Sequence, residues 1–333
     1  MSRRDRRGGN PRCVLRGAIQ ALWRRSFMLA LAAATAASLF AAAPVEFWQI
    51  TDTHLMKLDG VDPLIRKARQ HYLGSTEALR RFLAGLPKPG SPAFVLHTGD
   101  IIDAFRMDGE GGTTIERQIE HAKGVLAGSP VPVYLTLGNH DIQHYRATGG
   151  KIAADRDPAI AAAARRGWRD AAACFHNGTY YSFRQKSGKT EYLFVVLDNG
   201  ERAPPASSEH LRSQLQWLEK ELAASRAAAI IVVMHIPLAK DPVSDAIADV
   251  LGKSSRIALI LAGHRHTNGV EEIPIGGRIV PQIRTSAFAI DERDIRRVRL
   301  WEDRIEVFAT GKPEQLERTI PVGGAAAAAA GAR

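Results

Sequence analysis

Two histidines separated by one residue, His264 and His266, follow directly after an apolar run late in the chain. Imidazoles are common metal ligands, and a buried polar side chain is costly unless it has a partner. Four earlier stretches have the same form, an apolar run that ends in Asp, Asn or His: Asp52-Thr53-His54, Gly99-Asp100-Ile101-Ile102-Asp103, Gly138-Asn139-His140-Asp141 and Met234-His235. We expect all five stretches to converge on one site.

The side chains in these stretches are the types that bind divalent first-row metals. Carboxylates, imidazoles and one amide oxygen suit Zn, Mn or Fe, and the stretches contain no thiolate for a Cys-type structural zinc site. The candidate metal ligands are Asp52, His54, Asp100, Asn139, His235, His264 and His266. They are too many for one tetrahedral ion, but they fit two ions that share a bridge. Two ions about 3.5–4 Å apart stabilise both ends of a phosphoryl displacement.

Each of the five stretches comes after a predicted strand. The strands are expected at Val45–Ile50, Ala93–Leu96, Val131–Leu137, Ala229–Met234 and Ile257–Leu261. In open α/β sheets the carboxyl ends of the strands meet at one edge, and sites form there. Residues i and i+2 of an extended segment point to the same side, which predicts that Asp52 and His54 reach one point. The same argument applies to His264 and His266.

Helices are expected between these strands. Apolar residues at helical spacing predict helices over Ser75–Leu86, with Ser75 as N-cap, over Thr113–Leu126, and from Ser207 or Ser208 to Ala224. Strands return late in the chain, one of them at Ala287–Ile290. The order predicts the α/β class, as a four-layer α/β/β/α sandwich of two mixed β-sheets flanked by helices. We expect one domain over residues 44–321, followed by a disordered Ala/Gly tail over 322–333.

The first 43 residues have the composition of a targeting segment. They contain eight Arg and one Asp and so carry +7 of the chain's net charge of +10. An apolar run follows Arg24-Arg25 and ends in Ala41-Ala42-Ala43, a small-residue cleavage pattern. The segment resembles a twin-arginine export signal and predicts a periplasmic or secreted protein. The alternative is an uncleaved membrane anchor.

The rest of the chain is nearly balanced in charge, so no nucleic-acid partner is expected from the basic composition. Cys13 lies in the leader, which leaves Cys174 alone in the remainder. A single cysteine forms no internal disulfide, and we expect Cys174 to be a small buried residue. The oligomeric state is left open.

The motif set as a whole resembles the calcineurin-like metallophosphoesterase superfamily. The pattern of that superfamily is D-x-H, G-D, G-N-H-[DE], H and G-H-x-H in this order, and all five blocks occur here between Asp52 and His266. The resemblance implies that Asp52, His54 and His266 hold one metal ion. It further implies that the second ion is held by Asn139, His235 and His264, and that Asp100 bridges the two ions.

The resemblance also implies a mechanism, in which a metal-bridging hydroxide attacks phosphorus in line. His140 would stabilise or protonate the leaving oxygen, and Asp141 would hold its imidazole in place, unless Asp141 only caps a turn. Asp103 has two open readings. It would either accept a hydrogen bond from a metal-bound histidine or cap a turn.

The expected activity is hydrolysis of a small phosphate ester, with phosphodiesters favoured. The Asp-Thr-His and Gly-Asn-His-Asp blocks look most like those of small bacterial phosphodiesterases. The alternatives are a phosphomonoesterase of the same fold and, from another class, an inactive interaction module. An inactive module is disfavoured because no ligand of the pattern is missing.

Overall fold

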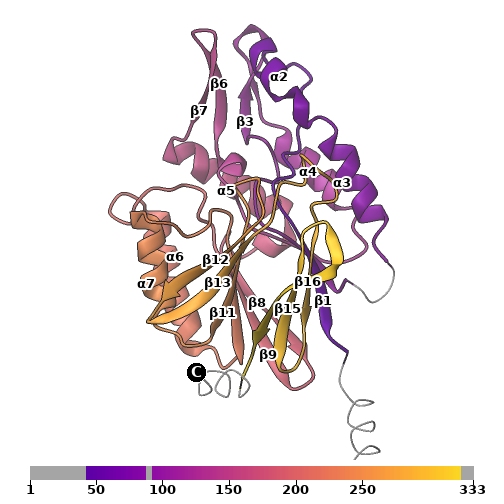
Figure 1. Cartoon of the computed structure of the whole chain (residues 1–333). Coiled ribbons are helices and arrows are strands. Elements are labelled where there is room, and N and C mark those ends of the chain that lie inside the picture. Colours follow the sequence, from indigo (N-terminus) through magenta and orange to yellow (C-terminus); the bar gives the residue numbers. More distant parts are fainter. Residues whose placement is uncertain (1–42, 88–91, 324–333) are drawn as a thin grey trace, which may run out of the picture. The chain divides into compact units, whose positions relative to one another are not determined.

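The computed structural model describes residues 43–87 and 92–323. Two six-stranded mixed sheets form its centre (Figure 1). The first sheet has the order β16 (Lys312–Pro321), β15 (Arg304–Ala309), β14 (Arg296–Leu300), β1 (Val45–Ile50), β2 (Phe94–His97) and β5 (Val133–Leu135). Strands β1, β2 and β5 are parallel, and the other pairs are antiparallel.

The second sheet is also parallel at its centre and antiparallel at its edges. Its order is β12 (Gly269–Ile275), β13 (Arg278–Arg284), β11 (Ile257–Ala262), β10 (Ala229–Val233), β9 (Thr190–Val196) and β8 (Tyr181–Ser187). The central strands β9 and β10 are buried almost throughout, which explains their continuous apolar sequences.

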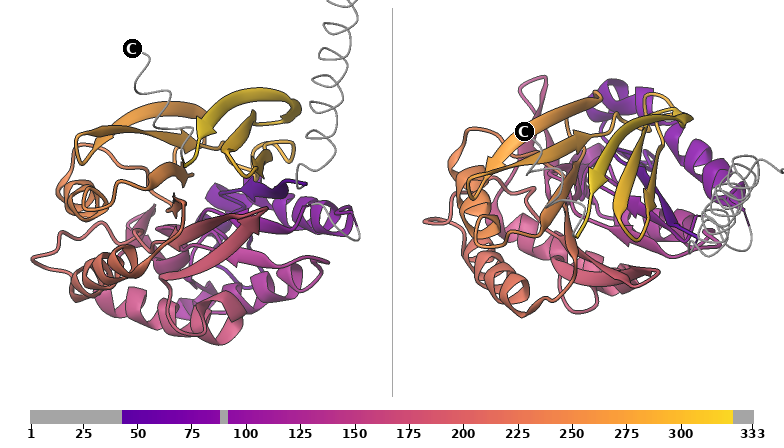
Figure 2. Two further views of the ribbon diagram at one scale, coloured as in Figure 1. Left: turned by 90° about the horizontal axis from the view of Figure 1, so that it is seen from below. Right: turned by 60° about the horizontal axis from the view of Figure 1, so that its bottom comes forward.

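Helices cover the outer face of each sheet, and a third apolar layer fills the space between the sheets (Figures 1 and 2). The first sheet is covered by α3 (Ser75–Ala84), α4 (Gln118–Leu126) and α5 (Pro158–Ala171), and the second by α6 (Glu209–Ala224) and α7 (Pro242–Leu251). Between the sheets, Phe47 and Phe94 stack at 4.8 Å and meet Phe194 edge-on. The predicted α/β/β/α sandwich is confirmed.

A small third sheet was not predicted. It has the order β4 (Thr114–Ile115), β3 (Arg106–Asp108), β6 (His144–Thr148) and β7 (Lys151–Asp155), and it shares a core with α2 (Pro63–Arg69). These elements stand beyond the carboxyl ends of β1 and β2, at the top of Figure 1. They therefore form a wall beside the edge where the predicted ligands lie.

Several sequence-based boundaries were wrong for local reasons. The predicted helix over residues 113–126 begins at Gln118, because Thr114 and Ile115 pair with β3. Ser75 is the first residue of α3 and its side chain makes no capping bond. The predicted strand Ala287–Ile290 is a turn whose amides bond to the backbone after β1, with Phe288 N–H donating to Thr51 O.

The described residues contain no helix both long and apolar enough to cross a membrane. Apart from Ala43, the predicted export signal lies outside the described residues, as does the tail from residue 324. These two assignments stay predictions. Val322, which was assigned to the tail, is buried in the core between the sheets.

Candidate metal centre

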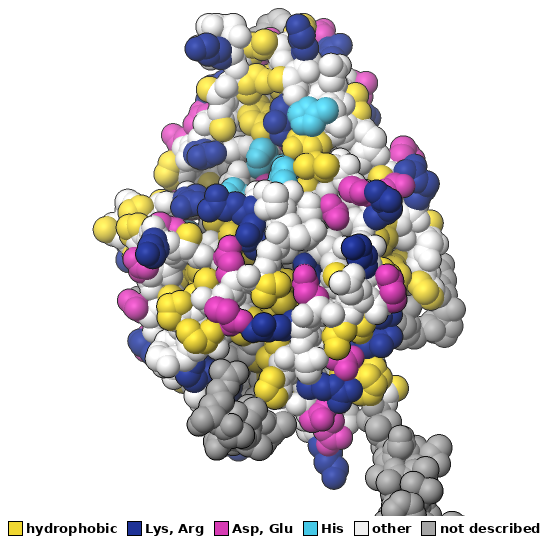
Figure 3. Space-filling model, in the orientation of Figure 1, with side chains coloured by type: hydrophobic (Ala, Val, Ile, Leu, Met, Phe, Trp, Pro, Cys, Tyr) yellow, Lys and Arg dark blue, Asp and Glu magenta, His cyan; other side chains and the backbone are white. Residues whose placement is uncertain are grey.

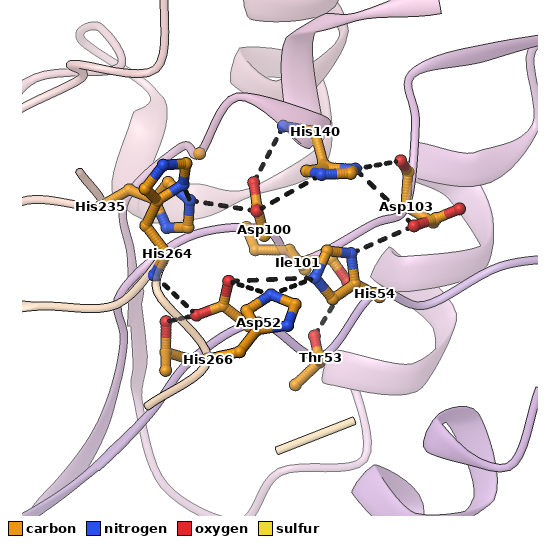
Figure 4. A network of polar contacts seen from close by, with 12 residues as sticks. Asp52, Thr53, His54, Asp100, Ile101, Asp103, His140, His235, His264 and His266 are labelled. Carbon is orange, nitrogen blue, oxygen red and sulfur yellow. Dashed lines mark hydrogen bonds and ion pairs between the residues drawn. The ribbon is translucent and has the colours of Figure 1, made fainter. Parts of the chain in front are cut away.

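The five predicted stretches meet at the carboxyl ends of the parallel strands (Figure 4). Asp52 and His54 follow β1, Asp100 and Asp103 follow β2, and Asn139 and His140 follow β5. In the second sheet, His235 follows β10, and His264 and His266 follow β11. The site therefore spans both sheets.

The backbone at this edge is not extended, which corrects the expectation that residues i and i+2 converge as they do in a strand. Five of the seven predicted ligands have positive φ: Asp52 (51°), His54 (43°), Asp100 (52°), His264 (71°) and His266 (52°). Such conformations cost roughly 1–3 kcal/mol each and persist where the surroundings enforce them. Arg202 is the other non-glycine residue with positive φ among those described. The strain is thus concentrated at the predicted metal centre.

Three motif glycines allow ligands from different strands to approach each other. A Cβ at Gly138 would lie 2.2 Å from Asp100 Oδ1, and one at Gly99 would lie 2.6 Å from the His235 ring. A Cβ at Gly263 would lie 1.9 Å from the hydroxyl of Thr51 and 2.7 Å from Asp52 Oδ2. Each glycine is therefore required because another ligand, or its hydrogen-bond partner, occupies the place of a side chain.

Asp52, His54 and His266 form the first group of potential ligands, with one ligand atom from each within 4.8 Å of the others. His266 Nε2 lies 3.1 Å from Asp52 Oδ1 and 3.2 Å from His54 Nε2. Asp52 is buried, and its other oxygen accepts the Thr51 hydroxyl at 2.6 Å and the His264 N–H at 3.0 Å. One oxygen of Asp52 is thus fixed by the chain while the other faces the two imidazoles.

Asp100, His235 and His264 form the second group. His235 Nε2 lies 3.0 Å from Asp100 Oδ2 and 3.3 Å from His264 Nδ1. The other ring nitrogen of His235, Nδ1, is 2.8 Å from the carbonyl oxygen of Thr98, so the proton on Nδ1 leaves Nε2 directed at the site. Together the two groups contain six of the seven predicted ligands, all except Asn139.

Two observations show that this donor set fits a pair of cations. Asn139 Oδ1 is buried and has no hydrogen-bond partner, as expected of an amide oxygen that binds a metal. In each group two imidazole nitrogens lie 3.2–3.3 Å apart beside a carboxylate. Burial would raise the pKa of Asp100, but His235 and His140 outweigh it and hold that pKa well below its usual range. The carboxylate is therefore charged.

His140 lies beside both groups, and contacts at its Nδ1 atom orient the ring. Its Nδ1 is 2.8 Å from the carbonyl oxygen of Asp103 and 3.0 Å from the Tyr145 hydroxyl. Its Nε2 is directed at the site, 3.9 Å from Asp100 Oδ2. Burial lowers the pKa of His140, although Asp100 opposes the shift. His140 also forms a third potential ligand group with His54 and Asp100.

The contacts of Asp141 favour the turn-capping reading over the one in which it holds the His140 imidazole. Its two carboxylate oxygens accept the backbone N–H groups of Ile102 at 2.9 Å and Gly138 at 2.8 Å. Asp141 thus links the loop after β5 to the loop after β2, and its carboxylate makes no hydrogen bond to the His140 ring. The backbone of Asp103 and the side chains of Gln143 and Tyr145 surround His140 Nδ1 instead.

Of the two readings of Asp103, the structure supports contact with a ligand histidine. Asp103 Oδ1 lies 3.1 Å from His54 Nδ1, so His54 directs Nε2 at the first group. Arg69 Nε donates to Asp103 Oδ2 at 2.8 Å. Burial alone would raise the pKa of Asp103, but Arg69 and His54 hold it at about 2.

Sequence reasoning missed Arg69 and Tyr72, both from the segment before α3. The Tyr72 ring stacks on His54 with centroids 4.5 Å apart and an interplanar angle of 7°. Arg69 and Tyr72 stand three residues apart in a segment that was assigned no element, whereas α2 ends at Arg69 and a short 3₁₀ turn follows. No local motif marks them, because their partners are distant in sequence: Arg69 bonds to Asp103, 34 residues away, and Tyr72 stacks on His54.

The centre is accessible from one side. His140, His264 and His266 are partly exposed, whereas Asp52, His54 and His235 are fully buried. Figure 3 shows histidine side chains together on this face, with Lys and Arg side chains beside them. A small anionic molecule can therefore reach the exposed imidazoles from solvent.

Comparison with known proteins gives a matching family and similar solved structures. The model of the family described as calcineurin-like phosphoesterase matches residues 45–268. A dimetal phosphatase from Danio rerio is similar with a TM-score of 0.54 and 18% identity, covering 84% of this chain and 100% of that chain. GAP50, described as the anchor in the inner membrane complex of Plasmodium, gives 0.52 and 11%, covering 84% and 90% respectively. No curated protein sequence matches significantly.

Proposed function

Because the chain belongs to the calcineurin-like phosphoesterase family, whose model matches residues 45–268, we propose that it hydrolyses small phosphodiesters with two divalent metal ions. The observation that carries the proposal is a pair of ligand groups at the strand ends. One is Asp52 with His54 and His266, and the other is Asp100 with His235 and His264. The similar structure from Danio rerio is also described as a dimetal phosphatase.

The chain supplies a separate ligand set for each ion. Asp52, His54 and His266 hold one, and Asn139, His235 and His264 hold the other, with Asp100 between them. When bound, such a pair of ions neutralises phosphoryl charge and lowers the pKa of water, so that a nucleophile is available near neutral pH. Mn, Fe and Zn all suit these ligands.

The protein orients these ligands before any ion arrives. Asp103 and the Thr98 carbonyl fix His54 and His235 through their Nδ1 atoms, which leaves both Nε2 atoms free for coordination. His140 stands beside Asp100 with its ring held at Nδ1. In this proposal the imidazolium form of His140, protonated at both ring nitrogens, contacts the leaving oxygen and transfers the Nε2 proton to it, which leaves a neutral ring with its proton on Nδ1.

A preference for diesters is supported by the charge around the centre. A monoester carries up to two negative charges at neutral pH and a diester carries one. The Arg69 guanidinium reaches the ligand cluster, and it donates hydrogen bonds to Asp103. Arg265, between the two histidines, is exposed at the surface. Neither Arg69 nor Arg265 is thus committed to the second charge of a monoester.

A substrate panel tests the preference. Nitrophenyl phosphate, bis(nitrophenyl) phosphate and cyclic nucleotides would be compared on the Mn-loaded protein, with kcat/KM as the measure. We expect the diesters to be hydrolysed at least about tenfold more efficiently than the monoester. A higher kcat/KM for the monoester would overturn the diester proposal and leave a phosphomonoesterase.

The metal requirement has its own test. Elemental analysis of protein purified without chelator should find two metal ions per chain. Asp100→Ala should abolish hydrolysis, and Lys253→Ala, a surface residue paired with Glu219, is the matched control. A metal-free protein that stays inactive in added Mn would refute the metal centre.

We further propose that the protein acts outside the cytoplasm, on a small soluble ester and without a nucleic-acid partner. The basis is the leader over residues 1–43 and the balanced charge of the rest. Sequencing the N-terminus of the mature protein decides between a cleaved signal and a retained membrane anchor. An intact Met1 would contradict cleavage.

A further inference from the structure

A sixth strand also ends in polar residues, although it carries no ligand. Strand β9 leads into Asp198-Asn199-Gly200, and Asp198 and Asn199 are buried. The neighbours of β9 are β8 and β10, and the ligand His235 follows β10. The turn after β9 is therefore placed to act on the ligands around it.

Asn199 binds the backbone at His235 through three hydrogen bonds. Its Oδ1 accepts the N–H of His235 at 3.2 Å and the N–H of Ile236 at 3.1 Å. Its Nδ2 donates to the carbonyl of Ile236 at 2.6 Å. A single buried side chain thus satisfies three backbone groups where the sheet ladder of β10 stops.

The next residue, Gly200, touches the loop that carries Asn139. A Cβ at Gly200 would lie 2.7 Å from the carbonyl group of Gly138 and 2.9 Å from the backbone nitrogen of Asn139. The turn therefore meets two of the predicted ligands of the second ion, one on each side. Among the described residues, this turn makes no hydrogen bond to Asp52, His54 or His266.

Asp198 anchors the turn in the protein. Its carboxylate accepts Arg165 Nε at 2.8 Å and the Thr179 hydroxyl at 2.6 Å, and its backbone N–H donates to Gln214 Oε1 at 2.7 Å. Burial would raise the pKa of Asp198, but Arg165 and His210 outweigh it and keep the carboxylate charged. Helices α5 and α6 thus hold the turn from two directions.

We propose that Asn199 is a positioning residue for the second metal ion. It sets the backbone at His235, and the adjoining Gly200 sets the loop at Asn139, so that both ligands face one point with His264. The inference rests on the proposed function in assuming that His235 and Asn139 hold an ion. It predicts that damage at Asn199 affects one ion and spares the other.

The first experiment needs no metal. Asn199→Ala should accelerate amide hydrogen exchange at His235 and Ile236 in the metal-free protein, because both N–H groups lose their acceptor. Asn199→Asp keeps an acceptor oxygen and should preserve most of that protection while losing the bond to the Ile236 carbonyl. Asn177→Ala, an exposed asparagine, is the matched control and should leave exchange unchanged.

The second experiment measures Mn binding to both sites by titration calorimetry of the full-length protein. Asn199→Ala should reduce the affinity for one of the two ions by about 10–100-fold, the usual effect of losing a residue that orients a ligand. The other ion should change by less than about threefold. Asn199→Asp should show a smaller loss at the same site, and it serves in place of the alanine variant if that variant does not fold.

Unchanged amide exchange at His235 and Ile236 in a folded Asn199→Ala protein would overturn the inference. Equal weakening of both ions, or of neither, would overturn it as well. A wild-type protein that binds two ions but hydrolyses no phosphate ester would instead refute the proposed function. In that case the exchange and binding results would still test whether Asn199 positions the ligands of the second ion.

Discussion

The rings of His264 and His266 face different carboxylates, although one residue separates them in the chain. His266 Nε2 lies 3.1 Å from Asp52 Oδ1, whereas His264 groups with Asp100 and lies 3.3 Å from His235 Nε2. Both residues have positive φ, which turns the backbone enough to send successive histidines to the two ligand groups. The segment after β11 thus joins the two predicted metal positions.

Replacing each histidine should therefore remove a different ion. We expect His266→Ala to weaken binding of the ion that Asp52 and His54 would also hold. His264→Ala should instead weaken binding of the ion that His235 and Asn139 would hold. Each loss of a direct ligand should reduce affinity at its own site at least about 100-fold, more than the loss of a residue that only orients a ligand. Spectroscopy of the Co-loaded variants would show which ligand set remains.

Arg265→Ala is the matched control, because Arg265 stands between the two histidines and is exposed. It should bind both ions as the wild type does. Loss of the same ion in both histidine variants would contradict the division of the two ligand groups.

Gly138→Ala should disrupt the centre without changing any ligand. The new Cβ would lie 2.2 Å from Asp100 Oδ1 and 2.5 Å from the Asp100 backbone nitrogen, so Asp100 or the loop after β5 must move. We expect kcat/KM to fall by at least about 100-fold, since displacements of about 1 Å have effects of this size. Gly124→Ala is the control, because a Cβ there meets nothing within 4 Å. Full activity in Gly138→Ala would contradict the close approach.

The gathering of the candidate ligands at the strand ends was predictable, because each follows an apolar run in an order that matches a known set of motifs. Their local geometry was not. The i, i+2 spacing of Asp52 and His54 suggested an extended segment, whereas both residues adopt positive φ. Strain of this kind is imposed by tertiary contacts, such as the bonds from Phe288 N–H to the Thr51 carbonyl and from Ala289 N–H to the Asp52 carbonyl.

The two-sheet sandwich was also predictable from the alternation of strands and helices, while the third sheet was not. Strands β3 and β4 have three and two residues, too few to show a period, and they exist through pairing with distant segments. Asp141 was assigned to His140 because they are neighbours in sequence. In the structure its partners are the Ile102 and Gly138 amides, a contact that depends on how two loops meet.

Asp141→Asn tests this structural role. A carboxylate accepts on both oxygens, whereas an amide turns an NH2 group toward one of the two backbone N–H donors. We expect the variant to lose about 1–3 kcal/mol of unfolding free energy, the penalty of an unsatisfied buried donor. Urea unfolding would measure it, with exposed Asp170→Asn as the control. Wild-type stability would contradict the role of Asp141 in linking the two loops by hydrogen bonds.

His140→Ala should slow substrates with poor leaving groups more than those with good ones. His140 Nδ1 faces the carbonyl oxygen of Asp103 at 2.8 Å, which directs Nε2 into the site beside Asp100. A ring in that place assists a departing alkoxide, which needs a proton, and contributes little to a nitrophenolate, which does not. The expected loss is about 10²–10⁴-fold in kcat/KM for an alkyl ester, the range of general acid catalysis, and within about tenfold for a nitrophenyl ester. The measurement is kcat/KM for aryl and alkyl methylphosphonates of increasing leaving-group pKa. The plot of log kcat/KM against leaving-group pKa should have a steeper slope in the variant.

His176→Ala, which replaces an exposed histidine, should leave the slope unchanged. Equal losses for every leaving group would instead make His140 a third ligand beside His54 and Asp100, as their grouping within 4.8 Å allows, and the metal content of the variant would then fall as well.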